Sequence, residues 1–292
     1  YGLNLPREGW GPELAGSGTL GYFRFVNSNL SWESGTASGE PLEVFLLTAA
    51  KDVSVAPYAI EGVRRNLKHP LRRISIIGPD IEPLRSLAKD CDCTFVDENS
   101  LLPLKLSDLN LPIQGINRSG WMFQQLLKLA IHRICEMSRY YTIDSDTVLV
   151  RPIRLEVDGK TVLYHSDEHH EPYFKKLRHL LGIEPRTPLS FVAHQMCFQP
   201  DRVAEMLKLI ESRFPEKPWH QTLIDTLDLH EVSDFSEFET YGQWMLVSHP
   251  AEIHREYFFN LGLTRDQLTS VEQLEKQYGG KFNSLSFHGY MS

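Results

Sequence analysis

Cysteine is scarce in this sequence, which has four cysteines in 292 residues. That number is too small for a disulfide framework, and the one close pair, Cys91 and Cys93, has no second pair or histidine at zinc-finger spacing. Free thiols are typical of a reducing compartment. We therefore expect a cytoplasmic protein, either free or peripheral at the inner face of the membrane.

Long apolar runs and an excess of positive charge are also missing. No apolar run approaches the roughly 18–20 residues that span a bilayer, so no transmembrane segment is expected. The chain has 30 Lys and Arg against 38 Asp and Glu, a net charge of −8. A basic field that would hold a polyanion is not expected, which argues against a nucleic-acid-binding protein.

What remains is an ordinary globular composition, with 41% hydrophobic and 23% charged residues. These values exclude the disordered and collagen-like classes. The length suffices for one large α/β domain. Because the first residue is Tyr1 rather than Met, we expect either that the native start has been removed or that the chain is a fragment of a larger multidomain protein.

The order of apolar segments predicts an α/β fold. Residues 1–41 are rich in Gly, Ser, Asn and Pro and predict an N-terminal extension or edge hairpin, and 42–292 would form a single domain. Apolar strands alternate with helical segments, which indicates a mostly parallel central sheet flanked by helices, with an elaborated C-terminal half. Strands are expected over 44–48, 73–77, 93–96 and 140–143, and helices over 55–67, 82–89, 121–134, 201–213, 219–229 and 264–278.

Two aspartates, Asp144 and Asp146, follow the fourth expected strand and flank Ser145. Ligands of open α/β sheets bind beyond the carboxyl ends of the strands, and alternate residues at a strand end can face one ion. Carboxylate ligands suit Mg²⁺ or Mn²⁺, completed by substrate phosphates and water. The structural alternative is an aspartate-rich turn that caps the next element.

The segment 144–148 also resembles the motif of haloacid-dehalogenase-type phosphatases, in which Asp144 would be the nucleophile and Asp146 the general acid. That family opens its domain with the motif, whereas three expected strands precede it here. The acidic metal pair that the family needs further along the chain is missing after Asp146. This phosphatase is the alternative enzyme, and a non-catalytic carbohydrate-binding module is the alternative of another class.

Residues 43–292 resemble the GT-A-fold glycosyltransferases, in particular a little-characterised bacterial group that uses nucleotide-sugars. The order and spacing of seven segments around the Asp-x-Asp motif support the resemblance: 45–48, 120–129, 144–146, 151–152, 190–196, 236–242 and 287–289. It implies a GT-A-like, Rossmann-like sheet and a metal-dependent enzyme of polysaccharide biosynthesis. The enzyme would transfer a sugar from a nucleoside-diphosphate-sugar donor to a saccharide or cell-envelope glycan acceptor.

The resemblance also implies roles for single residues around a divalent Mn²⁺ or Mg²⁺. Asp146 would bind the ion, Asp144 would contact the ribose or the ion, and His288 would be a further ligand near the C-terminus. The alternative for His288 is a tail residue without a role. The first strand and its loop hold the nucleoside in this fold, which implies Thr48, Ala49 and Asp52 around base and ribose.

The segment after Gly120 has a polar face, with Trp121, Gln124, Gln125 and Lys128 at helical spacing. An aromatic ring, two amides and an ammonium group can stack on a ring, bond hydroxyls and contact a phosphate. We expect Gln125 and Lys128 to bind the nucleotide-sugar, with the preceding Arg118 as a second phosphate contact. The alternative is a solvated helix face.

The segment 236–239 resembles the acidic segment that supplies the catalytic base in inverting GT-A enzymes. Glu237 or Glu239 would accept the proton of the acceptor hydroxyl. Because Ser236 and Glu239 also match a capping box, Glu237 is preferred as the base. An inverting reaction is slightly favoured, and a retaining reaction would need no such base.

Histidines form the last group of candidates. The run 165–171 has three histidines and three acidic residues at no spacing that places them on one helix face. It predicts a solvated loop over the sugar site, with His165 or Asp167 near sugar hydroxyls. His194, within an apolar run, is either a satisfied core residue or a contact for the nucleotide-sugar or the acceptor.

Overall fold

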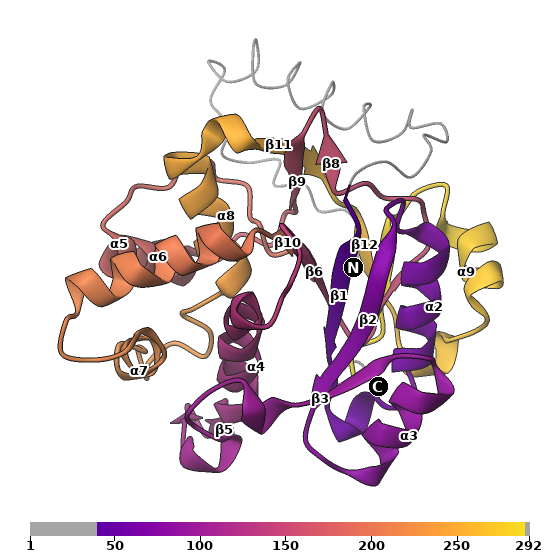
Figure 1. The fold of residues 1–292 in the computed structure, drawn as a ribbon, viewed down its shortest axis with the longest axis horizontal. Helices are drawn as coiled ribbons and strands as arrows, with labels where there is room; N and C mark the ends of the chain where they lie inside the picture. The colour runs from indigo at the N-terminus through magenta and orange to yellow at the C-terminus, as the bar shows by residue number, and fades with distance from the viewer. Residues whose placement is uncertain (1–39, 290–292) are drawn as a thin grey trace. The chain divides into compact units, whose positions relative to one another are not determined.

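A computed structural model describes residues 40–289, so nearly all of the expected N-terminal extension over 1–41 lies outside the described residues. The central sheet has five strands in the order β10-β6-β1-β2-β3 (Figure 1). Four strands are parallel and β10 is antiparallel to β6 at one edge, which confirms the predicted mostly parallel sheet. The strands are β1 (Leu42–Leu47), β2 (Leu71–Gly78), β3 (Thr94–Asp97), β6 (Tyr140–Asp144) and β10 (Gln195–Phe198).

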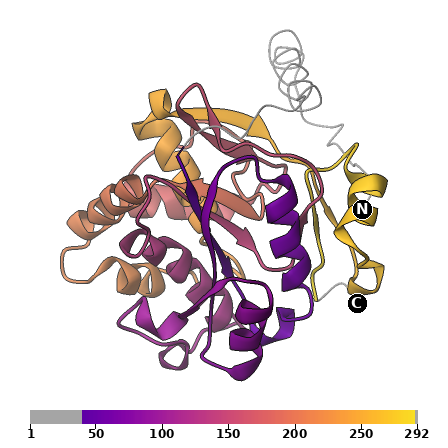
Figure 2. The same ribbon diagram turned by 45° about the vertical axis from the view of Figure 1, so that its right-hand side comes forward.

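Helices cover both faces of this sheet because its central strand is apolar on both faces. Along β1, Phe45 and Leu47 belong to one core cluster, while Val44 and Leu46 belong to another. Figures 1 and 2 show the two helical layers on opposite sides of the sheet. One layer contains α2 (Ala56–Asn66) and α3 (Glu82–Asp90), and the other contains α4 (Ser119–Ala130), α5 (Glu171–Leu181), α6 (Pro200–Arg213), α7 (Trp219–Asp225) and α8 (Glu237–Ser248).

Small sheets elaborate the second half of the chain. In one of them β13 lies between β12 and β7, antiparallel to β7, the strand that directly follows the Asp-x-Asp motif. The C-terminal segment is therefore paired beside that motif. These smaller elements are β4 (Pro112–Ile113), β5 (Ile116–Asn117), β7 (Thr147–Leu149), β8 (Glu156–Val157), β9 (Lys160–His165), β11 (Ile253–Tyr257), β12 (Asn260–Gly262), β13 (Ser284–Ser286) and α9 (Val271–Tyr278).

Three expected helices are shorter than predicted. The helix expected over 121–134 continues after Ala130 as a 3-10 turn, and the one expected over 219–229 ends at Asp225. The helix expected over 264–278 begins only at Val271, because the Ser270 side chain accepts from the Gln273 N–H and caps it there. Within residues 40–289, no helix is long and apolar enough to cross a membrane.

The acidic and histidine-rich run 165–171 is only partly the loop that was expected. His165 ends β9 and is fully buried, and α5 begins at Glu171. The His165 ring packs 4.2 Å from the Phe191 ring, measured between centroids, which accounts for its burial. Only 166–170 connects the two elements.

Candidate functional site

The strand order reverses between β1 and β6. From β1 the chain continues to β2 and β3 on one side, and it returns to the other side with β6. Leu47 is paired with both Ile77 and Asp144, so the ends of three parallel strands are level. Ligands of open α/β sheets bind outside the carboxyl ends at such a reversal. Thr48 and Ala49 follow β1 at this edge, beside Asp144.

Asp144 ends β6, and both of its carboxylate oxygens have cationic partners. Lys128 Nζ lies 2.8 Å from Oδ1, and His194 Nδ1 lies 3.3 Å from Oδ2. Burial alone would raise the pKa of Asp144, but the charges and hydrogen bonds of Lys128 and His194 lower it further than burial raises it. Asp144 is therefore an ionised carboxylate held between two cations.

Lys128 reaches Asp144 from α4 and also contacts α8. Its ammonium lies 2.8 Å from Glu237 Oε1 and 4.1 Å from the centre of the Phe238 ring. Burial opposes the charge, but Asp144 and Glu237 raise the Lys128 pKa above its ordinary value. Lys128 and Gln125 are 6% and 5% exposed, so a solvated helix face is excluded for these two residues.

His194 precedes β10 and lies directly across from Asp144, whose N–H donates to the His194 carbonyl over 3.0 Å. Its φ of +56° is in the left-handed region, a conformation that costs a non-glycine residue about 1–3 kcal/mol. His194 Nε2 lies 2.9 Å from Glu168 Oε1. Burial would lower the His194 pKa, but hydrogen bonds to Asp144 and Glu168 raise it to about 10. The imidazole is thus cationic at neutral pH.

Asp146 is joined to the C-terminal segment. The Phe287 N–H donates to the Asp146 carbonyl over 2.8 Å, which continues the pairing of β13 with β7. This pairing places His288 Nδ1 3.1 Å from Asp146 Oδ2, and the His288 ring lies 5.3 Å from the His194 ring between centroids. The metal-binding role of Asp146 and His288 stays a prediction, but the two side chains are adjacent.

Asp52 lies in the loop after β1 and forms an ion pair with Arg265. The Asp52 pKa is raised above its ordinary value, because burial and the nearby charge of Asp146 outweigh the lowering by Lys51 and Arg265. Arg265 Nε also donates to the Phe287 carbonyl over 3.2 Å. Asp52 thus contacts the residue that holds the C-terminal segment in place, on the same side of the site as Asp146.

The two candidate bases, Glu237 and Glu239, are both buried. Ser236 caps α8 as expected, since its hydroxyl accepts from the Glu239 N–H over 3.2 Å. The Glu239 carboxylate bonds elsewhere, accepting from the Ser190 hydroxyl over 2.8 Å, the Phe191 N–H over 2.9 Å and the Gln243 amide over 2.9 Å. The base role of either glutamate stays a prediction.

Sequence reasoning missed Glu168 and Arg265. In the run 165–171 it singled out His165 and Asp167, but Glu168 is the residue that reaches His194. The only signal was the charge of the run, which does not show which of its acids faces the strand end. Arg265 had no signal, because its partner Asp52 lies 213 residues away in the sequence.

The side chains present fit a divalent ion in part. Among residues 40–289, no group of three or more His, Cys, Asp and Glu side chains is arranged to hold a metal ion. Asp146 and His288 supply an oxygen and a nitrogen donor side by side, which suits Mn²⁺ with its remaining positions open to phosphate and water. Asp144 is less suited to direct coordination, because Lys128 and His194 contact both of its oxygens.

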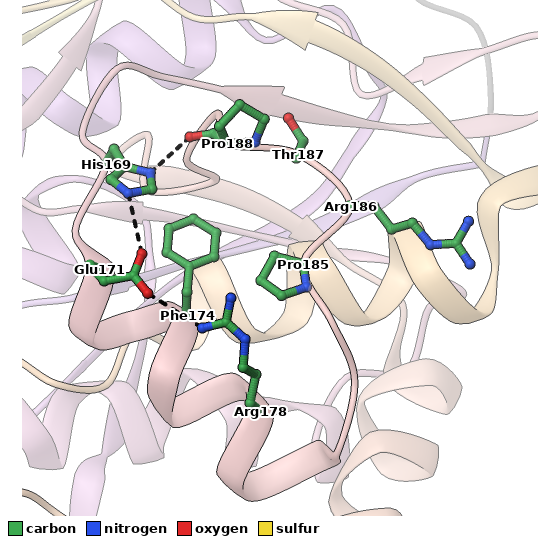
Figure 3. Close-up of a pocket in the computed structure, with 8 residues that line it drawn as sticks. All are labelled: His169, Glu171, Phe174, Arg178, Pro185, Arg186, Thr187 and Pro188. Carbon is green, nitrogen blue, oxygen red and sulfur yellow. Dashed lines mark hydrogen bonds and ion pairs between the residues drawn. The ribbon is translucent and has the colours of Figure 1, made fainter. Parts of the chain in front are cut away.

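A surface hollow of about 270 Å³ lies between the start of α5 and the segment 185–188 (Figure 3). The basic side chain of Arg178 is already paired there with Glu171 and Glu184. In Figure 3 the Arg186 side chain points away from the other lining residues. None of the predicted site residues lines this hollow, whose lining is His169, Glu171, Phe174, Arg178, Pro185, Arg186, Thr187 and Pro188.

Residues 67–278 match the profile of a family of unknown function, DUF6492, and the chain belongs to this family. No curated protein matches it. Among solved structures, the chain is similar to the galactosyltransferase LgtC in complex with donor and acceptor sugar analogues. The two share 10% identity and a TM-score of 0.45, over 85% of this chain and 87% of that one.

Two further solved structures are similar to this chain. The bifunctional glycosyltransferase WbbM has 12% identity and a TM-score of 0.47, over 88% of this chain and 47% of that one. Glucosyl-3-phosphoglycerate synthase from Mycobacterium tuberculosis, in complex with Mn²⁺, UDP and glucosyl-3-phosphoglycerate, has 13% identity and a TM-score of 0.35, over 78% and 76%. All three TM-scores are below 0.5, so the function is inferred from the geometry of the site.

Proposed function

We propose that this chain is a metal-dependent GT-A-type glycosyltransferase that transfers a sugar from a nucleoside-diphosphate-sugar to a saccharide or glycan acceptor. One observation carries the proposal. Asp144 and Asp146 leave the sheet at its point of strand reversal, and Asp146 lies beside His288, brought there by the pairing of β13 with β7. This is where an α/β sheet binds its ligand, and the paired donors suit a divalent ion.

The charge of the site supports a cation between protein and donor. Five carboxylates lie around the strand end and face three cations, so negative charge is in excess: Asp52, Asp144, Asp146, Glu168 and Glu237 against Lys128, His194 and Arg265. A diphosphate would be repelled by this set of carboxylates. When bound at Asp146 and His288, a divalent ion would offset that repulsion and stabilise the charge that develops on the leaving nucleoside diphosphate.

The chain's own side chains would orient the donor. Thr48 and Ala49 lie at the end of β1, next to Asp144, and would hold the nucleoside beside the paired aspartates. Asp144 would accept a hydrogen bond from the ribose while Lys128 and His194 keep it ionised. Asp52, on the Asp146 side of the site, would contact the base or the ribose of the same nucleoside.

For Glu237 we propose a positioning role. Its carboxylate is 4% exposed and accepts from Lys128 Nζ, so it fixes the lysine that in turn holds Asp144. Glu239 binds the backbone and hydroxyl of the segment that leads to His194. The inverting reaction predicted from the sequence needs a base within reach of the acceptor, and neither carboxylate is at the surface.

The first test measures binding of nucleoside diphosphates to the purified chain by calorimetry, with Mn²⁺ and with EDTA. We expect at least one diphosphate of a panel to bind only with Mn²⁺, and Asp146→Asn to abolish that binding. Asp201→Asn is the matched control, because Asp201 is an exposed acid in the first turn of α6 to which no site role is assigned. Unchanged binding in Asp146→Asn would remove Asp146 from the site.

The second test separates the alternative functions. Nucleotide-sugars and phosphomonoesters are incubated with the protein and Mn²⁺, and the products are quantified. We expect slow hydrolysis of a nucleotide-sugar. Cleavage of phosphomonoesters alone would favour the phosphatase, and Asp144 is placed poorly for that chemistry since both its oxygens are bonded to cations. Sugar binding that persists in Asp146→Asn, without turnover, would favour a carbohydrate-binding module.

A further inference from the structure

Helix α4 has candidate site residues at both of its ends, Arg118 at its start and Lys128 near its end. It begins after the β4–β5 hairpin and runs to the sheet, where Lys128 contacts Asp144 (Figure 1). Arg118 is the N-cap residue of this helix, ten positions before Lys128. At 1.5 Å per residue, the two backbones are about 15 Å apart along the helix axis. The backbone of Arg118 is thus about three helical turns from the residue that contacts the Asp-x-Asp motif.

Arg118 is a half-buried cation without an anionic partner. Among the described residues, no carboxylate forms an ion pair with it within 4.0 Å, and burial lowers its pKa. Its Nη2 donates to the Ser233 hydroxyl over 2.8 Å, and its guanidinium lies 4.2 Å from the centre of the Trp121 ring. Its Nε is buried and has no hydrogen-bond partner in the described part of the chain. A desolvated arginine with an unused donor is suited to an oxyanion ligand.

A second unused donor lies on the same face of α4. Gln125 is 5% exposed, and its Oε1 accepts from the Glu237 N–H over 3.1 Å. Its Nε2 has no partner among residues 40–289, although a buried amide donor without a partner is costly. Gln125 is seven positions after Arg118, two turns further along this face. Two donors without a partner, Arg118 Nε and Gln125 Nε2, therefore lie on the face of α4 that also carries Lys128.

Two side chains from the start of α5 converge on the partner of Arg118. His170 Nε2 donates to the Ser233 carbonyl, and the Tyr173 hydroxyl is hydrogen-bonded to Ser233. Tyr173 also interacts electrostatically with Arg118 and Glu237. The connection between α7 and α8 is thereby fixed against α4 and α5, which holds Arg118 in a defined position.

We propose that Arg118 binds an oxyanion of the acceptor substrate, either a carboxylate or a phosphate. The Trp121 ring, on which the guanidinium stacks, and the Ser233 hydroxyl hold Arg118 in position for this contact. Because the Arg118 backbone lies about 15 Å along α4 from Lys128, the residue that contacts Asp144, we assign this oxyanion to the acceptor rather than to the donor diphosphate. The acceptor is then an acidic saccharide or a phosphorylated molecule. This acceptor role rests on the proposed function, and it differs from the donor-phosphate contact expected from the sequence.

The test is calorimetric titration of the full chain at constant ionic strength without divalent metal, using inorganic phosphate and malonate as probes. We expect one or both to bind, and Arg118→Gln to weaken that binding about tenfold or more, with partial retention in Arg118→Lys. Arg186→Gln is the control, because Arg186 is exposed. Preference for phosphate or for malonate identifies the anion. No binding to the wild type, or an equal loss in Arg186→Gln, would overturn the oxyanion site.

A second arm separates the acceptor from the donor. Phosphate is titrated in the presence of a saturating nucleoside diphosphate with Mn²⁺, and we expect its affinity to stay within about twofold. Displacement of phosphate by the nucleoside diphosphate would overturn the acceptor role and show that Arg118 binds the donor. If no nucleoside diphosphate binds while Arg118→Gln still loses the anion, the proposed function fails and the oxyanion site stands. Circular dichroism of each variant confirms folding, and Arg118→Lys serves if Arg118→Gln does not fold.

Discussion

The ammonium of Lys128 lies 2.8 Å from Oδ1 of Asp144, and the lysine side chain is only 8% exposed. A second carboxylate, that of Glu237, lies at the same distance from the ammonium. One buried cation therefore links α4, the end of β6 and the first turn of α8. The position of the Asp-x-Asp motif thus depends on the packing of two helices as well as on the sheet.

Replacing Lys128 with methionine should destabilise the fold strongly. Two buried carboxylates would lose their shared cation, and breaking a buried ion pair costs about 3–5 kcal/mol. Lys128→Met/Glu237→Gln should recover part of that loss, because it removes one of the unpaired charges. Urea unfolding measures the effect, with the exposed Lys105→Met as the control. A Lys128→Met variant as stable as the wild type would contradict the ion-pair arrangement.

The pKa of His194, raised to about 10, predicts a pH dependence of stability. The unfolded imidazole titrates near 6.5, so the folded chain binds more protons than the unfolded chain between about pH 6.5 and 10. The free energy of unfolding gained from His194 is fully present below that range and is lost as the pH rises through it. Unfolding of wild type and His194→Gln across pH 6–10 should show a smaller decline in the variant. Parallel declines would show that His194 is not the group responsible.

Glu168 should contribute to that raised pKa. Its carboxylate lies 2.9 Å from His194 Nε2, so Glu168→Gln removes a negative charge next to the imidazole. We expect the His194 pKa, followed by NMR titration, to fall from its raised value, because burial lowers it and only Asp144 would remain to oppose that effect. Asp167→Asn, which changes an exposed neighbour in the same loop, should leave the titration unchanged. An equal shift in both variants would point to a general charge effect.

Two helical glycines provide a matched pair for the packing near the site. A Cβ at Gly242 in α8 would overlap the Phe191 ring, whereas a Cβ at Gly120 in α4 meets no atom within 4 Å. Gly242→Ala should therefore destabilise the protein by about 1–3 kcal/mol through overpacking. Gly120→Ala should stabilise it by up to about 1 kcal/mol, because alanine favours the helix. Thermal unfolding distinguishes these opposite signs, and a tolerated Gly242→Ala would show that α8 can move from Phe191.

Much of the sheet could be predicted from local patterns. The apolar run at 44–48 and the run at 140–143 became β1 and β6, because a strand buried on both faces needs apolar side chains in succession. The antiparallel strand β10 was not predicted, since its four residues lie in a long apolar stretch without a distinct period. The loop over 165–171 was predicted too long at both ends, because the burial of His165 depends on a distant ring.

The sequence by itself determined the α/β order and the two aspartates at a strand end, because apolar periodicity and the polar residues that interrupt it are local properties of the chain. It also pointed to Lys128 through the polar face of its helix and to His288 through resemblance. Only the tertiary structure decided their partners: Lys128 with Asp144 and Glu237, and Asp146 with His288. These contacts join residues 16 to 142 positions apart, and the packing of helices and the pairing of β13 with β7 bring them together.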